Sequence, residues 1–316
     1  MISLLVMLGL FEASSDHPNT VRRFVERSET RTLKSVEASR DGRQLPVDRL
    51  PKLKRTDHRT LEIEVVDEWI EVDGLPRVQR TFDAAFGARK MEAQSLRRAD
   101  SKPVEVTEEF DSVLVGEVLH AAHAKEGWTL AKTDGCSLGA ETLKRLRADL
   151  SFGFLAASGE EEASKPRVLG AEAVAILMNP TGAIPKDDEE DWTDVSECRG
   201  GQVHYAGTVT VTPTKDTRYE GTPVQELAVV LKGRATWSSQ PRPELGIEGE
   251  STLTGKGRAL FDPKQKLVVL LELDVLAKTD QRENVSMELP DKSEASLQTV
   301  EHEERMIEVR VKAMVE

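Results

Sequence analysis

The residue types best suited to metal chemistry are two closely spaced histidines, His120 and His123, followed along the chain by Cys136. Imidazole and thiolate groups are the ligands that zinc prefers. On a β-strand, however, residues three positions apart point to opposite faces, and no third ligand is evident beside them. The two rings could converge only if the strand ended at His120. We therefore expect exposed hairpin residues here, with a metal site at His120 and His123 as the alternative.

The two cysteines, Cys136 and Cys198, are too far apart in the sequence to form a C-x-x-C zinc or redox motif. They leave two interpretations, one disulfide or two inert thiols. Export from the cytoplasm would favour the bridge, because disulfides persist in oxidising compartments.

Motifs for catalysis and for cofactors are missing from the sequence. It has no G-x-S-x-G, no S-x-x-K set and no glycine-rich phosphate loop before a helix. The acidic runs Glu160–Glu162 and Asp187–Asp191 lack the spacing of a calcium loop, so we expect solvated linkers. No catalytic residue and no cofactor is predicted, and enzymatic activity is left open.

Charge argues against one class of partner. Asp and Glu number 56 against 43 Lys and Arg, and the formal net charge is -13. Nucleic-acid binding needs a basic patch, and the richest basic stretch, Arg40–Arg59, also contains Asp41, Asp48 and Asp57. We expect no nucleic-acid partner.

The N-terminal residues Met1–Leu10 form an apolar run, and Ala13 and Ser15 follow as small residues suited to signal-peptide cleavage. The run is too short to span a bilayer, and no Lys or Arg precedes it. We predict a signal peptide over residues 1–15, an exported chain, periplasmic or extracellular, and no membrane span in the mature protein. The alternative is a buried N-terminal element of a cytosolic protein.

Alternation of apolar and polar residues predicts mostly β-strands. It is clearest over Ile307–Val315, as for a sheet with one wet face. Over Leu61–Val72 the alternation slips in phase, which predicts a bulge, with a helix as the alternative. Asp73-Gly74 predicts a tight turn and an antiparallel return over Leu75–Phe82. Further strands are expected over 21–36, 112–120, 128–133, 202–212, 225–237, 250–261 and 266–278.

Two short helices interrupt this pattern. Over 140–150, Leu143, Leu146 and Leu150 share one face, with Lys144, Arg145 and Arg147 outward, and 171–178 is rich in alanine. We predict a mainly β fold, a β-rich α+β protein in which two blocks of antiparallel strands flank a short central helical segment. The predicted divisions are residues 1–15, a β-rich block over 16–156, a linker over 157–198 and a C-terminal β block over 199–316.

A short C-terminal stretch, Gly255–Pro263 followed by Leu267–Asp274, resembles the strand, Phe-Asp turn and strand of uncharacterised exported bacterial β-rich proteins. It covers about 20 residues and carries no family active site. The resemblance implies an antiparallel hairpin outside the cytoplasm and nothing more.

These observations favour an exported, non-catalytic binding or scaffold module of unknown ligand. Its partner would be a protein or an apolar small molecule. One alternative is a carrier of an apolar ligand, in which a curved sheet wraps the helix of Leu143, Leu146 and Leu150. A second alternative is a hydrolase without recognisable motifs. The four tryptophans, Trp69, Trp128, Trp192 and Trp237, are expected in sheet packing, with a ligand groove as the alternative.

Overall fold

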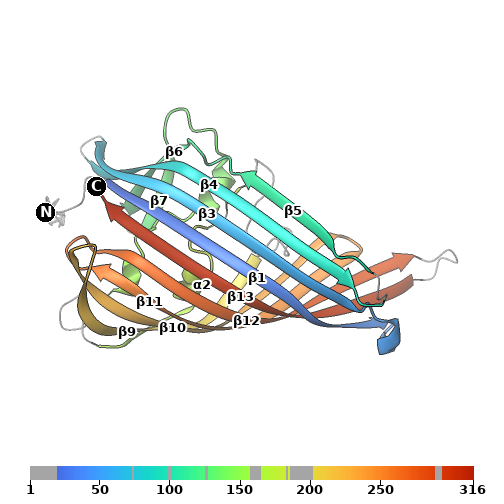
Figure 1. Cartoon of the computed structure of the whole chain (residues 1–316). Helices are drawn as coiled ribbons and strands as arrows, with labels where there is room; N and C mark the ends of the chain where they lie inside the picture. The colour runs from blue at the N-terminus through green and yellow to red at the C-terminus, as the bar shows by residue number, and fades with distance from the viewer. Residues whose placement is uncertain are drawn as a thin grey trace, which may run out of the picture.

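The computed structural model describes residues 20–72, 75–97, 101–124, 127–156, 165–182, 184–185, 202–288 and 294–316. Within these ranges the chain is mainly β and forms one antiparallel sheet of 13 strands. The longest strands run for about 20 residues and curve together, as Figure 1 shows. The prediction of a mainly β, antiparallel fold is confirmed.

The strands of the first half are β1 (Thr20–Arg40), β2 (Arg43–Gln44), β3 (Leu53–Val72), β4 (Leu75–Ser95), β5 (Val104–Asp111), β6 (Val118–Ala124) and β7 (Gly127–Lys132). The second half contributes β8 (Arg167–Leu169), β9 (Gln202–Tyr219), β10 (Thr222–Arg242), β11 (Leu245–Asp262), β12 (Leu267–Glu288) and β13 (Glu294–Val315). The helices are α1 (Ala140–Arg145) and α2 (Ala171–Met178), with 3-10 turns at Val47–Arg49 and Gly153–Leu155.

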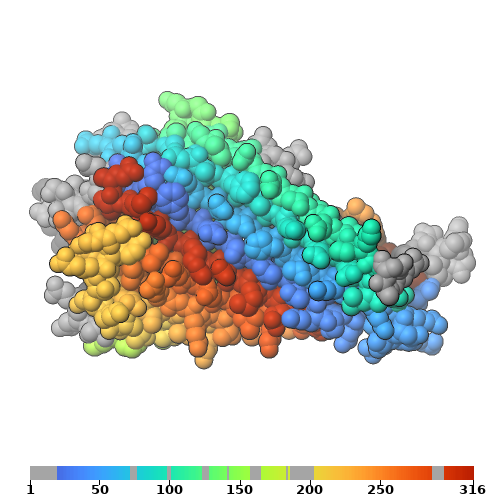
Figure 2. All heavy atoms as spheres, in the orientation of Figure 1, coloured from blue at the N-terminus to red at the C-terminus, as the bar shows by residue number. Residues whose placement is uncertain are grey.

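The prediction of two strand blocks flanking a helix is wrong, because the first and last strands pair with each other. The strand order is β7-β6-β4-β3-β1-β13-β12-β11-β10-β9-β8, with β2 beside β1 and β5 beside β4. The β1–β13 pairing runs from Val21↔Val315 to Arg40↔Leu297, and Figure 2 shows these blue and red strands side by side. Local alternation cannot reveal a pairing between opposite ends of the chain.

Alternating residues give the sheet two different faces. The inner face, which includes Val25, Leu271 and Val309, is buried. The outer face carries exposed ion pairs between neighbouring strands, such as Arg258–Glu272 at 2.6 Å and Arg282–Glu248 at 2.9 Å. The outer face is therefore the wet face that the sequence pattern predicted.

The core lies on the inner face, where α2 packs against β9 and β10. Four side chains of α2 are buried, namely Ala173, Val174, Leu177 and Met178. They join one apolar cluster with inner residues of β9 to β13, among them Val209, Leu231 and Leu273. Phe152 and Leu155, beside the 3-10 turn, complete this cluster.

Two hairpins agree with the turns predicted from the local sequence. Strands β11 and β12 are joined at Asp262, whose side chain accepts hydrogen bonds from the backbone N–H of Lys264 and Gln265 at 2.8 and 3.1 Å. This is the antiparallel hairpin expected over 255–274. Strands β3 and β4 pair down to Val72↔Leu75, as the Asp73-Gly74 turn predicted, although residues 73–74 lie outside the described part.

Three local predictions need correction. Strand β3 keeps its phase, and the bulge lies in β4, where Glu64↔Ala84 is followed by Val65↔Phe82. The strand expected over 112–120 begins only at Val118, while the acidic strand β5 was missed because it shows little apolar alternation. Helix α1 ends at Arg145 and not near 150, because Leu146 forms a β-bridge with Gly182.

Candidate functional site

The two strands at the ends of the strand order, β7 and β8, both line one open cleft of about 640 Å³, here called the seam cleft. The rest of its lining comes from α1, α2 and the residues next to them. These belong to the connecting segment, residues 134–185, which also includes β8. The volume falls within the range of small-molecule sites, roughly 300–1,000 Å³. The lining residues are Trp128, Lys144–Asp149, Phe154, Leu169, Gly170, Glu172, Ala173, Ile176 and Gly182.

The floor of the seam cleft is apolar. Phe154, Leu169 and Ile176 are half-buried and pack against the core cluster beneath them. Trp128 stands beside them and meets the ring of Trp69 edge to face, with centroids 6.2 Å apart. Apolar side chains that remain accessible in a concave site are typical of ligand pockets. Trp128 therefore lines a groove, which was the alternative considered for the tryptophans, whereas Trp237 is buried in the sheet.

The lining of the seam cleft also carries charges of both signs, namely Lys144 and Arg145 at the end of α1, Arg147 just after it, and the carboxylates Asp149 and Glu172. Arg147 was expected to point outward from a helix over 140–150. Helix α1 instead ends two residues before Arg147, and the Arg147 side chain is half-buried. Its Nη2 donates to the carbonyl of Asn179 at 3.3 Å. Burial lowers the pKa of Arg147, against the opposing influence of Asp149 and Glu172.

One wall of the cleft is held by a buried carboxylate, Asp67 of β3. Arg80 of β4 donates to Asp67 through Nε at 2.7 Å, and Arg23 of β1 also pairs with it. The Nη1 of Arg80 then donates to the carbonyl of Arg147 at 3.0 Å. This ion triad therefore fixes the backbone of the cleft wall from the inner face of the sheet.

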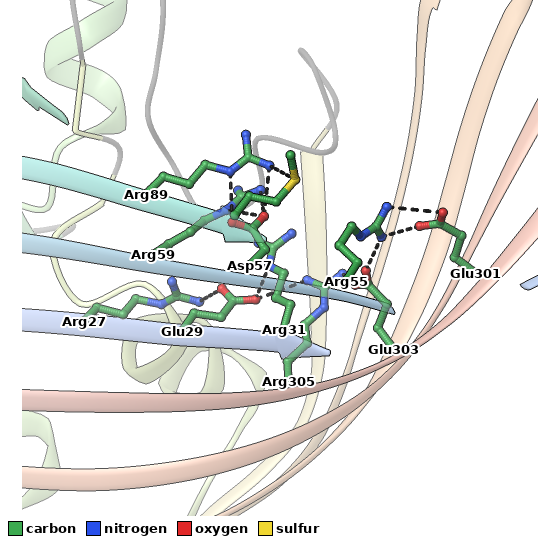
Figure 3. A network of polar contacts seen from close by, with 11 residues as sticks. Arg27, Glu29, Arg31, Arg55, Asp57, Arg59, Arg89, Glu301, Glu303 and Arg305 are labelled. Atoms are coloured by element: carbon green, nitrogen blue, oxygen red, sulfur yellow. Dashed lines mark hydrogen bonds and ion pairs between the residues drawn. The ribbon is translucent and has the colours of Figure 1, made fainter. Parts of the chain in front are cut away.

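Helix α2, which supplies Glu172, Ala173 and Ile176 to the cleft lining, is tied to a second buried carboxylate, Glu29 of β1, which is 1% exposed. Arg27 and Arg31 contact Glu29 at 3.0 and 2.6 Å, and Arg305 of β13 lies 3.6 Å from it (Figure 3). Arg27 also donates through Nε to the carbonyl of Met178, the last residue of α2, at 3.0 Å. A cation at a helix C-terminus is favourable because the helix dipole is negative there.

The ion network of Figure 3 continues from Glu29 along the inner face. In the pairing of β1 with β3, Glu29 lies directly beside Arg59, and Arg31 lies directly beside Asp57. Opposite charges therefore face each other across these two strands. Asp57 contacts Arg59 and Arg89, each at 2.9 Å. At the other side, Arg55 contacts Glu303 at 2.7 Å and Glu301 at 2.5 Å, and Arg305 lies 3.3 Å from Glu303.

The network keeps its buried carboxylates ionised. Burial alone would raise the pKa of Glu29, but Arg31, Arg27 and Arg305 outweigh it and hold that pKa below its usual range. The same balance lowers the pKa of Asp57, through Arg89 and Arg59, and of Asp67, through Arg80 and Arg23. A general acid needs the opposite shift, so these groups are suited to positioning and not to proton transfer.

The candidates for metal and thiol chemistry, His120 and Cys136, are not among the residues that line the seam cleft. His120 and His123 both belong to β6, and the side chain of His123 is outside the described part. Within the described ranges, no group of three His, Cys, Asp or Glu is placed to hold a metal ion. Cys136 is half-buried, and burial raises the pKa of its thiol, as does Glu117. Cys198 lies outside the described residues, so the bridge between Cys136 and Cys198 stays a prediction.

The positioning residues were missed, although the sequence held a signal for them. In β1, Arg23, Arg27 and Glu29 occupy the same alternate positions as the buried Val21 and Val25. Charged residues at core positions of a strand indicate buried ion pairs, because a lone buried charge is too costly to keep. The cleft floor gave no comparable signal.

Comparison with known proteins adds no family. No protein-family model and no curated protein matches the chain. Among solved structures, OccK7 (OpdD) of Pseudomonas aeruginosa is 6% identical over 93% of this chain and 99% of that chain, with a TM-score of 0.22. A likeness of that size carries no argument about fold or function. In the described ranges, no helix has the length and apolar character needed to cross a membrane.

Proposed function

We propose that this chain is an exported, non-catalytic binding module whose ligand occupies the seam cleft. The observation that carries this is the accessible apolar floor of Phe154, Leu169 and Ile176 within a cleft of about 640 Å³. The elements that carry the floor and its surroundings are held by hydrogen bonds from Arg80 to the carbonyl of Arg147 and from Arg27 to the carbonyl of Met178. A rigid frame of this kind favours binding, since little conformational freedom is lost when a ligand is taken up.

A non-catalytic role is supported by the chemistry of the described residues. The buried carboxylates Glu29, Asp57 and Asp67 are held ionised, which disfavours the raised pKa that a hydrolase acid requires. The alternative of a carrier for an apolar ligand is supported by the same apolar floor, with the ligand bound in an open cleft. The hollow that borders the core near Trp237 measures about 30 Å³, which suits a water molecule better than a ligand.

The binding proposal is tested with Nile red, a neutral apolar dye, titrated into the full chain. Leu169→Gln places an amide in the cleft floor and should weaken binding about tenfold, because an apolar contact surface is lost. Val168→Gln on the same strand is the matched control, since Val168 is 68% exposed and does not line the cleft. Equal binding by both variants, or none by the unaltered chain, would overturn the cleft as the binding site.

Export is tested separately, by mass spectrometry of the mature N-terminus after expression in the native host. The apolar run Met1–Leu10 and the small residues Ala13 and Ser15 support cleavage after about residue 15. We expect a mature chain that begins near residue 16. A chain that still begins at Met1 would contradict export by a cleaved signal peptide.

A further inference from the structure

We propose that the ligand of the seam cleft is an anionic amphiphile, with an acyl chain on the apolar floor and a carboxylate or phosphate head group at Arg147. This inference rests on the proposed function and adds the chemistry of the ligand. The two parts of such a molecule match two kinds of residue in the lining of one cleft, the cation Arg147 and the apolar Phe154, Leu169 and Ile176.

Arg147 is the group best placed to receive the head group. Its Nε is buried and has no hydrogen-bond partner among the described residues. Asp149 and Glu172 line the same cleft and act on Arg147 electrostatically, but among the described residues neither forms a direct ion pair with its guanidinium. Since no direct ion pair within this part of the chain neutralises its charge, the guanidinium gains from an anionic head group in the cleft, because charge-assisted hydrogen bonds are about twice as strong as neutral ones.

The position of Arg147 is set by backbone contacts and so does not depend on the ligand. Its own N–H donates to the carbonyl of Thr181 at 3.2 Å, and its carbonyl accepts from Arg80 at 3.0 Å. The neighbouring bridge between Leu146 and Gly182 needs glycine, because an added Cβ at Gly182 would lie 2.4 Å from the carbonyl oxygen of Arg145. The guanidinium is thus mounted on a fixed turn beside the apolar floor.

The negative net charge of the chain limits which anions can bind at Arg147. With a formal net charge of -13, the chain repels anions at long range. Simple inorganic anions would therefore gain little by approaching the cleft. An anion attached to an acyl chain gains the apolar contact as well, and this combination selects an amphiphile.

The test is isothermal titration calorimetry of the full chain with three ligands that share one chain length, each below its micelle concentration. Dodecanoate and dodecyl phosphate carry the two head groups, and dodecanol is the neutral match. We expect both anions to bind about tenfold or more tightly than dodecanol, as a charged hydrogen bond predicts. Stronger binding of one anion assigns the head group as carboxylate or phosphate.

Arg147→Met retains the apolar stem and should abolish the preference for the anions, whereas Arg147→Lys should keep much of it. Lys132→Met, which removes an exposed cation of β7 outside the cleft, is the control and should leave the preference intact. Dodecanol binding as well as dodecanoate would overturn the anionic head group. If Nile red binds at Leu169 and none of the dodecyl ligands binds, the amphiphile is wrong while the binding module stands.

Discussion

The inner face of the sheet holds the connecting segment in two different ways. Across β9 to β12 the contact is apolar, and Val209, Leu231 and Leu273 share one buried cluster with side chains of α2. Across β1, β3 and β4 there is apolar packing as well, for example of Val65 and Phe82 in one cluster with Leu146. On this side, however, Arg27 of β1 and Arg80 of β4 also donate to the backbone carbonyls of Met178 and Arg147. The β9–β12 side, here called the apolar side, therefore relies on packing, whereas the β1, β3 and β4 side, here called the ionic side, adds directed hydrogen bonds to its packing.

The difference shows what each kind of contact can specify. Apolar burial is proportional to area and has no direction, so it holds α2 against the sheet without fixing its rotation closely. A guanidinium bound to one carbonyl fixes distance and angle. One arginine contact holds Arg147 in the lining of the seam cleft, and the other holds the last residue of α2, the helix that supplies Ile176 to the lining, so a small shift at either would change the shape of the cleft. We infer that the ionic side of the sheet sets the geometry of the cleft and the apolar side supplies most of the stability.

Among the tests of this difference, acid should change the stability most, because it acts on several ionic contacts at once. The folded-state pKa values of Glu29, Asp57 and Asp67 lie below their unfolded values. Their stabilisation is therefore complete above the unfolded pKa, about 4, and is lost as pH falls through the folded values. We expect the urea midpoint to fall steadily below about pH 5. A midpoint that stays constant from neutral pH to pH 3 would contradict the stabilising role of the network.

Glu29→Gln removes the central charge of the network and leaves Arg27, Arg31 and Arg305 without their shared carboxylate. Breaking a buried ion pair in this way costs about 3–5 kcal/mol. Urea unfolding measures the loss. Glu26→Gln, at an exposed position of the same strand, is the matched control and should change stability by less than about 0.5 kcal/mol. Equal stability of the two variants would show that the network contributes nothing.

Leu273→Ala probes the apolar side. Leu273 is fully buried in the core cluster, and truncation of such a leucine costs about 2–5 kcal/mol. Leu276→Ala on the outer face of the same strand should cost clearly less, because Leu276 is only half-buried. Nile red binding by Leu273→Ala should remain normal below its unfolding temperature. A lost cleft in this variant would contradict the division between stability and geometry.

The sequence predicted the apolar side better than the ionic side, for a physical reason. Ile307–Val315 alternates cleanly, and Ile307, Val309 and Val311 are buried as expected. Asp67 stands at the next inner position after Val65, and its burial is possible only because Arg23 and Arg80 neutralise it. From local alternation alone, such a residue is taken for a break in phase, because the compensating charges come from other strands.

The seam cleft could be predicted only in its parts. Leu146 and Leu150 are buried in one cluster with Leu143 packed against it, as the shared face implied. The cleft itself depends on Trp128 of β7 and Leu169 of β8 approaching the same segment. That approach follows from the β1–β13 pairing, which brings the whole sheet into one curve. A pairing between residues at opposite ends of a chain leaves no trace in local patterns.

The smallest expected effect concerns a packing detail shared by both regions, in which an aromatic ring lies over a glycine on the neighbouring strand. Phe110 covers Gly87 on the ionic side, and Trp237 covers Gly249 on the apolar side, each directly opposite in register. In Gly249→Ala the new Cβ would lie 2.3 Å from the Trp237 ring, which also stacks under Arg305 at 5.6 Å. We expect a loss of about 1–3 kcal/mol by overpacking, measured by urea unfolding.

Gly246→Ala on the same strand is the control for that substitution, because no atom lies within 4 Å of its new Cβ. It should be neutral or slightly stabilising, since alanine restricts the unfolded chain more than glycine does. If Gly249→Ala is equally harmless, the Trp237 ring is free to move and Arg305 is held by its carboxylates alone. In that case the aromatic contact would not link the two regions, and the boundary between them would lie at Glu29 and Glu303.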